Sequence, residues 1–367
     1  MKKYLILLLA ITSLTLCFTS CTEDDDPIKP SSSDATGLYF INYGGSSVGA
    51  GSITKYIADE DSAVNFYYEA QNGVELTSNI QYACEYKNKI YMMGNGNDQI
   101  IVLDSLFVQH ESGISEDILV PRYCVGEGDY LYVSCWKNSS EWNIGMPNSY
   151  IAKLNITTNQ VEKTIPVPGG PEGLAVANGN VYAALNYKDS IAVIDQASDA
   201  VSYIATPAVT SYFVKDNKEN LYVSLVSTSS NKSEKTGLGY INTSNNTLET
   251  TYDLAGMSSN YASIMSANTD FSKIYLLATS YDENYQLFGT VYTFDVSTKE
   301  FTPFIENLSG PNGVQYDKKS DKLYVFGGTS YTEPGAVDVY NTDGTHISQF
   351  GCGVSPYWAF YLDYDVE

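Results

Sequence analysis

The side chains that most often act as acids, bases or metal ligands are scarce in this sequence. Only two histidines occur, His110 and His346, and 43 acidic residues outnumber 20 basic ones, which gives a net charge of −23. Phosphate contacts need clustered cations, so the charge argues against nucleic acid as a partner. We find no Ser, His and Asp set, no paired His ligands and no Gly-rich phosphate loop. We therefore expect no catalytic residues, no metal and no cofactor, and we predict that the protein is not an enzyme.

Aromatic side chains are abundant and could bind an amphipathic ligand. The chain contains 32 Tyr, 13 Phe and 3 Trp, and many of these rings lie in segments rich in Gly and Asn, where exposed rings form recognition surfaces. Three carboxylates in the same kind of segment, Glu172, Asp189 and Glu283, could accept hydrogen bonds from a ligand. Without a partner acid they are poor evidence for hydrolysis. Whether the rings act together depends on the elements that position them.

The N-terminal segment is typical of an exported, lipid-anchored protein. Lys2 and Lys3 precede a short apolar run, and Phe18–Cys21 resembles a bacterial lipobox, so we expect residues 1–20 to be a signal peptide and Cys21 to carry lipid. An ordinary secretory signal with an incidental Cys is the alternative. Residues 21–36 are acidic and then rich in Pro and Ser, as in a flexible tether.

One unit is repeated along the rest of the chain, residues 37–367. An aliphatic-Tyr-aliphatic pattern recurs seven times, at intervals of roughly 40 to 53 residues, which is near the period of four-stranded propeller blades. The repeated tyrosines are Tyr39, Tyr91, Tyr132, Tyr182, Tyr222, Tyr275 and Tyr324. Alternating apolar residues on such strands pack between blades, so we expect these tyrosines to form the core.

Further elements flank each repeated tyrosine. A second apolar strand follows it and closes in Asp or Asn, as at Asn155 and Asp195, which we expect to cap tight hairpins. A third strand precedes it in six units, and the seventh copy, Pro356–Leu362, stands at the C-terminus. The sequence thus predicts an all-β, seven-bladed β-propeller with four-stranded blades, in which the C-terminal strand closes the ring. The first two blades match the pattern least well.

The predicted topology gathers one set of loops on one face. The loop after each Tyr strand opens on the same side as the start of the next innermost strand, and these loops vary in length, as binding loops do. We predict a ligand site on this face. The candidate ligand-binding residues are Tyr43, Tyr82, Arg122, Tyr123, Trp136, Trp142, Tyr187, Tyr212, Tyr261, Tyr281, Tyr285, Tyr331, Tyr357 and Trp358. The alternative is that individual rings only pack the loops down. His110 and His346 fall elsewhere, and we expect both on the surface.

Four further cysteines follow the lipobox in the sequence. Cys124 and Cys135 flank a turn, and we consider a cross-strand disulfide between them, which would leave Cys84 and Cys352 as the second pair. Such bridges are geometrically demanding, and buried free thiols are the alternative.

The sequence resembles a known family in its N-terminus and its blades. The lipobox ending in Cys21 and the acidic run Glu23–Asp26 resemble the export signal of surface lipoproteins in Bacteroides-type bacteria. The alternative is that the acidic run is a solvated linker that carries no export signal. Blade segments such as Pro171–Val176 and Ile191–Asp195 resemble YncE-like propellers, and the lipoprotein form resembles the cobalamin-capturing BtuG family. The resemblance covers nearly all of residues 37–367.

The resemblance implies a surface protein of the outer membrane, attached by lipid alone. It would capture cobalamin or another corrinoid on the loop face and hand it to an outer-membrane TonB-dependent transporter. A second hypothesis is a glycan-binding or protein-docking lipoprotein, because aromatic platforms also stack on sugars. A third is a lyase or lactonase, which would need a convergent acid, base or metal set that the sequence does not contain.

Overall fold

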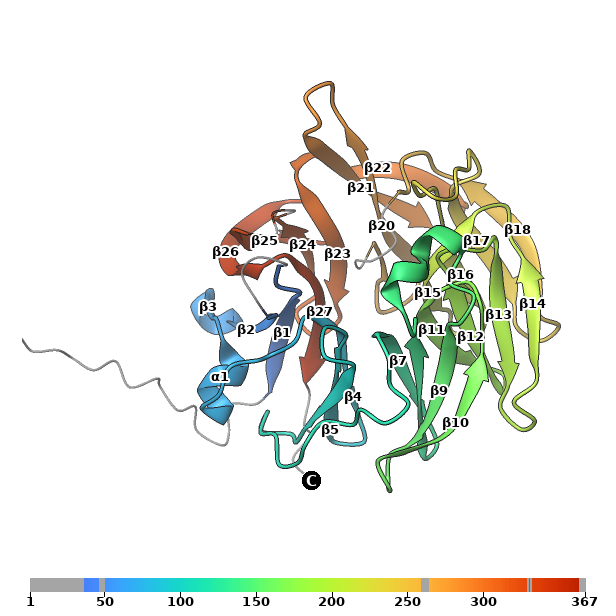
Figure 1. The fold of residues 1–367 in the computed structure, drawn as a ribbon. Helices are drawn as coiled ribbons and strands as arrows, with labels where there is room; N and C mark the ends of the chain where they lie inside the picture. The colour runs from blue at the N-terminus through green and yellow to red at the C-terminus, as the bar shows by residue number, and fades with distance from the viewer. Residues whose placement is uncertain (1–35, 46–49, 259–263, 329, 331, 363–367) are drawn as a thin grey trace, which may run out of the picture.

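The structure is a ring of small antiparallel sheets. The computed structural model describes residues 36–45, 50–258, 264–328, 330 and 332–362. These residues form seven sheets around a central axis (Figure 1), so the predicted seven-bladed β-propeller is confirmed. The predicted signal peptide, Cys21 and nearly all of the tether lie outside the described residues.

Six of the described sheets have four strands, which we name from the axis to the rim. Blade 1 is β27 (Pro356–Leu362), β1 (Gly37–Asn42), β2 (Ser52–Ile57) and β3 (Ser62–Val64); blade 3 is β7 (Pro121–Glu127), β8 (Tyr130–Cys135), β9 (Tyr150–Asn155) and β10 (Gln160–Pro166); blade 4 is β11 (Pro171–Ala177), β12 (Asn180–Leu185), β13 (Ser190–Asp195) and β14 (Val201–Ala205). Blade 5 is β15 (Val209–Lys215), β16 (Leu221–Val226), β17 (Gly237–Asn242) and β18 (Thr247–Asp253); blade 6 is β19 (Met265–Ala267), β20 (Lys273–Tyr281), β21 (Leu287–Asp295) and β22 (Glu300–Ser309); blade 7 is β23 (Pro311–Asp317), β24 (Lys322–Gly327), β25 (Pro334–Asn341) and β26 (His346–Val354).

Blade 2, one of the two blades that match the sequence pattern least well, deviates from this four-stranded pattern. Blade 2 has three strands, β4 (Ile80–Tyr86), β5 (Lys89–Gly94) and β6 (Gln99–Leu103), and its fourth position is reduced to a single bridge between Ile100 and Ile114. Within blade 1, a one-turn 3₁₀ helix (Ala58–Glu60) joins β2 to β3. Between blades 1 and 2 the chain forms helix α1 (Tyr67–Asn72), which buries Tyr67 and Tyr68.

The two ends of the described chain meet in blade 1. Strand β27 pairs with β1 in antiparallel register, with Phe360 opposite Tyr39 and Trp358 opposite Ile41. The innermost strands then contact one another in a closed cycle around the axis (Figure 1). This closure, which the C-terminal copy of the strand predicted, protects the inner edges of the sheets from further pairing.

The repeated tyrosines form the core between blades. All seven are at most 2% exposed, because the alternation of the second strand turns each of them toward a neighbouring sheet. Tyr39, for example, stacks on Phe107 and Phe360 with ring centroids 4.8 and 5.6 Å apart. The prediction that these tyrosines form the core is confirmed.

The hairpins opposite the loop face are closed by Asx side chains, as their spacing predicted. A side-chain oxygen of Asn155 accepts from the backbone N–H of Thr157, and one of Asp195 accepts from that of Ser198. Comparable bonds are made by Asp104, Asn242 and Asp295. Such side-chain bonds satisfy backbone N–H groups that have no strand partner at the turn. Both histidines are exposed, each beside an aspartate.

The cysteine pairing considered from the sequence does not occur. The β7–β8 hairpin turns at Gly128 and Asp129, with Glu127 opposite Tyr130, and this register places Cys124 opposite Val133. Cys135 lies beyond it, opposite Pro121. All four described cysteines are free thiols. The sulfur nearest to that of Cys124 belongs to Cys84, at 2.9 Å, so Cys84 is not left over for Cys352 either.

Candidate functional site

On the loop face, five of the described blades (1, 2, 3, 4 and 7) share the same backbone contact. The backbone N–H at the start of a loop donates to a carbonyl just before an innermost strand, as in Trp136 to Val120 and Asn186 to Gly170, both at 3.0 to 3.1 Å. The same kind of bond joins residues 43 and 355, 95 and 79, and 328 and 310. Two other backbone bonds, from residue 51 to 78 and from residue 227 to 257, link a loop of one blade to the segment that leads into the next blade. These bonds hold the variable loops around the mouth of the central axis.

Four large aromatic side chains occupy one level of the axis. On each innermost strand, one residue pairs with the repeated tyrosine of the adjacent strand. The residue two positions before that paired residue, on the same innermost strand or just ahead of it, defines this level. The residues at this level are Tyr82, Tyr123, Gly173, Tyr212, Ile264, Gly313 and Trp358. We call Tyr82, Tyr123, Tyr212 and Trp358 the axial ring cluster.

The rings of the axial ring cluster contact one another across the axis. The centroids of Tyr82 and Tyr123 are 3.7 Å apart in a stacked pair, and Trp358 lies 4.7 Å from Tyr82. Tyr212 reaches Tyr123 at 6.1 Å and Trp358 at 6.2 Å. Gly173, in the blade between Tyr123 and Tyr212, adds no side chain there, so the two tyrosines can meet. The rings therefore form a floor beneath the mouth.

Glycine at position 173 is required by its neighbours as well. A Cβ on Gly173 would lie 2.6 Å from the carbonyl oxygen of Ser211, which is backbone of the next blade. Because that strand cannot move independently of its sheet, a larger residue at 173 would push blades 4 and 5 apart.

Burial keeps the hydroxyls of the cluster neutral. Tyr82 and Tyr212 are buried, and burial raises the pKa of both phenols well above the ordinary value. Tyr357, beside the cluster on β27, has its pKa raised for the same reason, and its hydroxyl donates to the carbonyl of Ile80 at 2.9 Å. These groups therefore act as neutral hydrogen-bonding groups rather than as bases.

An ion pair lies next to the rings, between blades 3 and 4. Nε and Nη2 of Arg122 each donate to a different carboxylate oxygen of Glu172 at 2.9 Å, a bidentate arrangement. Trp136 covers the guanidinium, 4.0 Å from its ring centroid, and donates from its indole nitrogen to the carbonyl of Pro171. Asn186 donates to the same carboxylate at 3.3 Å.

The ion pair is almost fully buried, which determines its electrostatics. Arg122 is 6% exposed and Glu172 1% exposed. Burial alone lowers the pKa of the guanidinium, but the charge and hydrogen bonds of Glu172 more than offset this, so Arg122 stays protonated. Burial raises the pKa of Glu172, and Arg122 opposes that rise. Each charge depends on the other to remain in the interior.

The structure separates the sequence-predicted residues into two groups. Tyr82, Arg122, Tyr123, Trp136, Tyr212, Tyr357 and Trp358 gather at the axis, with Tyr187 packed on Trp136 and Tyr43 on Tyr357. Trp142 lies on the 3₁₀ helix Ser139–Ile144, Tyr281 at the end of β20 and Tyr285 in the β20–β21 loop; they are 54, 68 and 86% exposed, and we call them the rim rings. Tyr261 and Tyr331 lie outside the described residues.

Trp136 corrects one expectation. The concentration of tryptophans in polar loops predicted exposed rings, but Trp136 is 6% exposed and seals the ion pair. Its loop starts within hydrogen-bonding distance of an innermost strand, so its first residue turns inward. The sequence prediction also left Asn186 out of the site, although Asn186 directly follows β12 just as Trp136 directly follows β8.

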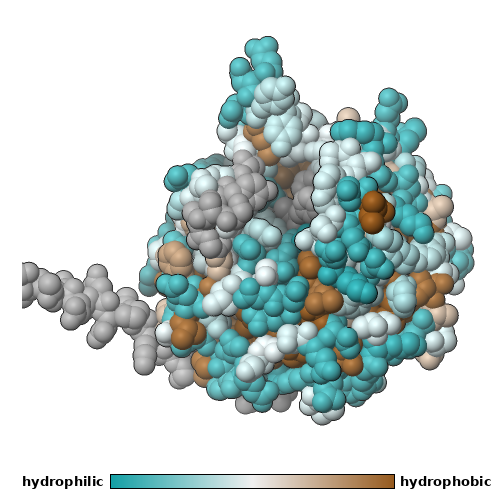
Figure 2. Space-filling model, in the orientation of Figure 1, coloured by the Kyte–Doolittle hydropathy of each residue, from teal (hydrophilic) through white to brown (hydrophobic). Residues whose placement is uncertain are grey.

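The β20–β21 hairpin projects beyond its neighbours and carries Tyr281 and Tyr285 (Figure 1). Figure 2 shows the molecule hollowed beside this hairpin, with a mostly hydrophilic surface on the described residues around the hollow. On the other side lies the 3₁₀ helix Ser139–Ile144, which carries Trp142. The rim rings thus stand on projections rather than on the floor.

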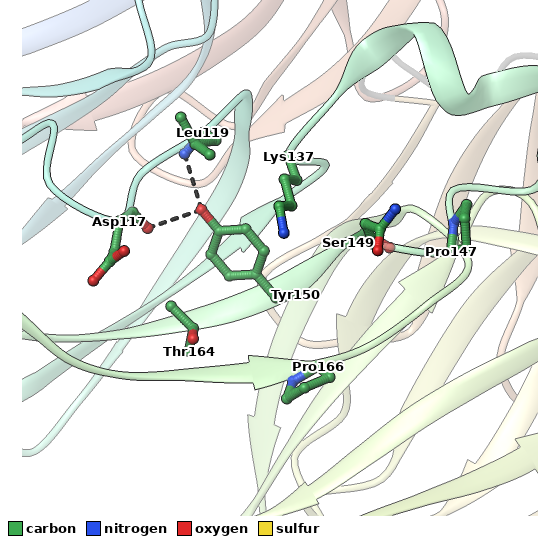
Figure 3. Close-up of a pocket in the computed structure, with 9 residues that line it drawn as sticks. Asp117, Leu119, Lys137, Pro147, Ser149, Tyr150, Thr164 and Pro166 are labelled. Atoms are coloured by element: carbon green, nitrogen blue, oxygen red, sulfur yellow. Dashed lines mark hydrogen bonds between the residues drawn. The ribbon is translucent and has the colours of Figure 1, made fainter.

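A separate cavity of about 270 Å³ lies on the flank of blade 3. It lies between Leu119 and Lys137 on one side and β9 and β10 on the other, and Tyr150 bonds to the backbone of Asp117 and Leu119 at its wall (Figure 3). None of the predicted site residues lines it. Within the described part of the chain, no three His, Cys, Asp or Glu side chains gather to hold a metal ion.

A family model matches residues 36–358, nearly the whole propeller. The chain belongs to the DUF5074 family, a domain of unknown function. No curated protein matches the chain. Membership of this family assigns no ligand.

Solved structures share the fold of this DUF5074 member at low identity. A quinonprotein alcohol dehydrogenase-like protein from Bacteroides thetaiotaomicron is 16% identical with a TM-score of 0.66, over 90% of this chain and 79% of that one. A putative 6-phosphogluconolactonase from Bacteroides uniformis is 9% identical with a TM-score of 0.63, over 88% and 98%. A Staphylococcus aureus virginiamycin B lyase is 12% identical with a TM-score of 0.52, over 79% and 92%. At these identities the likeness extends to the fold alone.

Proposed function

We propose that this propeller is a lipid-anchored cell-surface protein of the outer membrane that binds a corrinoid, such as cobalamin, on its loop face. It would pass the corrinoid to an outer-membrane TonB-dependent transporter. The observation that carries the proposal is the axial ring cluster, a floor of four aromatic rings beneath a ring of variable loops. Broad aromatic floors with a few fixed polar groups suit large amphipathic ligands.

Two polar atoms near the mouth support binding of a ligand that both donates and accepts. The indole nitrogen of Trp358 has no acceptor among the described residues, and Oδ1 of Asn95 has no donor there. The amide nitrogen of Asn95 already donates to Gln81, which holds the side chain beside the start of β4. Both atoms are buried, so a ligand would reach them only after the atoms that cover them move. A corrinoid carries peripheral amides, each with one acceptor and two donor hydrogens, which would then satisfy both atoms.

The electrostatics of the centre favour binding over catalysis. Glu172 would be the natural acid or base at the axis, but both of its oxygens accept from Arg122. A carboxylate held in this way positions neighbours and has little freedom to transfer a proton. We therefore propose a function in which no bond is made or broken.

The anchoring rests on the N-terminal sequence. The lipobox-like segment ending at Cys21 and the acidic residues after it support export to the outer surface. In the described residues, no helix is long and apolar enough to span a bilayer. Lipid on Cys21 would tether the propeller through residues 21–36 and leave the loop face free to meet a transporter.

Calorimetric titration of the detergent-solubilised full chain with cyanocobalamin, together with co-elution of the coloured ligand on a sizing column, tests the proposal. We expect one-to-one binding. Absence of binding at high micromolar cyanocobalamin would discard the corrinoid.

A paired variant locates the site. Trp358→Phe keeps a ring at the floor and removes the unpaired N–H, so we expect about tenfold weaker binding of cyanocobalamin, the equivalent of one hydrogen bond. Tyr285→Phe removes a hydroxyl from a rim ring that is 86% exposed and serves as the matched control, with unchanged affinity expected. Equal affinities for both variants and the unaltered protein would move the site away from the floor.

A second candidate ligand is a glycan, and the rim rings favour it. Trp142, Tyr281 and Tyr285 are exposed on projecting segments where sugar faces could stack. A glycan array probed with the same protein distinguishes the two candidates. Glycan binding that is lost in Trp142→Ala and retained in Trp358→Phe would favour this alternative.

A further inference from the structure

Two thiols from neighbouring blades touch just below the floor. Sγ of Cys84 on β4 lies 2.9 Å from Sγ of Cys124 on β7. The two residues are 40 positions apart in the chain, so the ring of blades, and not a local turn, brings them together.

The positions of both thiols are fixed by ordered neighbours. Tyr82 precedes Cys84 by two residues and Tyr123 directly precedes Cys124, and these two rings stack with centroids 3.7 Å apart. Both cysteines lie within paired stretches of their strands, with Cys84 opposite Tyr91 and Cys124 opposite Val133. The sulfur contact is therefore made by two strands whose separation is already set by the fold.

Cys84 and Cys124 differ in solvent exposure, and this difference determines which thiol reacts first. Cys84 is partly exposed, whereas Cys124 is buried, and burial together with the hydrogen bond to Cys84 raises the pKa of Cys124 well above the ordinary value. An incoming reagent therefore meets Cys84 first. The remaining described thiols, Cys135 and Cys352, are buried elsewhere, and burial raises the pKa of each to about 12.

We propose that Cys84 and Cys124 form a disulfide that joins blades 2 and 3 when the protein meets a disulfide oxidant. The thiolate of Cys84 attacks the oxidant disulfide, forming a mixed disulfide and releasing one thiol. Cys124 then gives up its proton to solvent and attacks Sγ of Cys84, which releases the second thiol. In sum, two protein thiols and one external disulfide become one protein disulfide and two external thiols.

The bond would lock the floor of the candidate site. It joins the two strands that carry Tyr82 and Tyr123, and it closes a loop of 40 residues. Closing a loop of that length removes freedom from the unfolded chain. For a propeller of this size we expect the melting temperature to rise by about 5 °C on oxidation.

The test uses the purified full chain, fully reduced and then incubated with oxidised glutathione, followed by tryptic mapping without reductant. We expect residues 56–87 and 123–137 to appear as one linked species, which reductant separates. Because the second peptide contains both Cys124 and Cys135, the map is repeated with Cys135→Ser, and the link is expected to persist. A link that disappears in Cys135→Ser, or two unlinked peptides, would overturn the proposal.

Thermal unfolding supplies an independent readout. We expect Cys84→Ser to abolish the oxidation-dependent rise in melting temperature, and Cys352→Ser, a buried thiol in another cluster, to retain it. An equal rise in Cys84→Ser would also overturn the proposal. None of these measurements depends on which ligand the loop face binds.

Discussion

The axial ring cluster and the rim rings lie on the same face and have similar chemistry, yet they are built differently. The cluster comes from strands, and its members occupy equivalent positions in four blades, so the rotation of the ring brings them together at the axis. The rim rings come from a 3₁₀ helix and from the tip of the β20–β21 hairpin, and they are more than half exposed. In a propeller, side chains at equivalent positions of the innermost strands therefore come together at the axis. Side chains that only share the loop face do not.

Charged pairs show the same contrast. Arg122 and Glu172 are linked by two hydrogen bonds in the interior, while Lys87 and Asp129 form a pair of similar length, 2.9 Å, with side chains 48 and 73% exposed. Water screens the second pair and not the first. The centre of the molecule therefore depends on its polar contacts far more than the surface does, and three substitutions test this difference.

The largest effect is expected from breaking the central ion pair. Arg122→Met leaves Glu172 buried without its cation, which should lower the free energy of unfolding by about 4 kcal/mol at pH 7, measured by urea denaturation. Without Arg122, the pKa of Glu172 should rise further, so its charge is present in the unfolded chain but unfavourable in the folded one. The loss should then be smaller at pH 5 than at pH 8.

Two controls sharpen that result. Lys87→Met removes the cation of the exposed pair and should change the stability by less than about 1 kcal/mol. The double variant Arg122→Met, Glu172→Met should recover much of the loss, because no uncompensated charge remains. If Arg122→Met and Lys87→Met were equally destabilising, the contrast between centre and surface would fail.

The next effect concerns the rings. Tyr212 is 6% exposed and packs against Tyr123 and Trp358, so Tyr212→Ala should lower the free energy of unfolding by about 3 kcal/mol through loss of packing and the cavity left behind. Tyr285→Ala removes the same side chain from the rim and should cost less than about 0.5 kcal/mol. Similar losses in the two variants, measured by urea denaturation, would mean that the rim rings are packed in solution.

The sequence predicted the fold well because the fold depends on a repeated local pattern. The aliphatic-Tyr-aliphatic strands and the Asx hairpins each need only a few neighbouring residues, and both occur where predicted. Ring closure followed from one surplus strand, Pro356–Leu362. Features that repeat with the blade were therefore accessible without coordinates.

Contacts between blades were much harder to predict. The pairing of Arg122 with Glu172 and of Cys84 with Cys124 joins residues 50 and 40 positions apart, and strand bulges at the start of β4, β7 and β11 set which side chains meet. A bulge changes the register by a residue and leaves little mark in the sequence. The Cys124 to Cys135 pairing was wrong for a simpler reason: the two-residue turn after Glu127 places Cys124 opposite Val133.

The smallest effect on stability is expected at the rim, where Trp142 is 54% exposed on the 3₁₀ helix Ser139–Ile144. Trp142→Ala should change the free energy of unfolding by less than about 0.5 kcal/mol in urea denaturation, because few buried contacts are lost. For a ligand that covers the floor and reaches the loops, we expect about threefold weaker binding of cyanocobalamin in a calorimetric titration, less than for Trp358→Phe. The opposite result would be a Trp142→Ala variant that unfolds but whose remaining folded molecules bind cyanocobalamin normally. It would show that Trp142 packs its loop and that the ligand contacts only the rings on the strands.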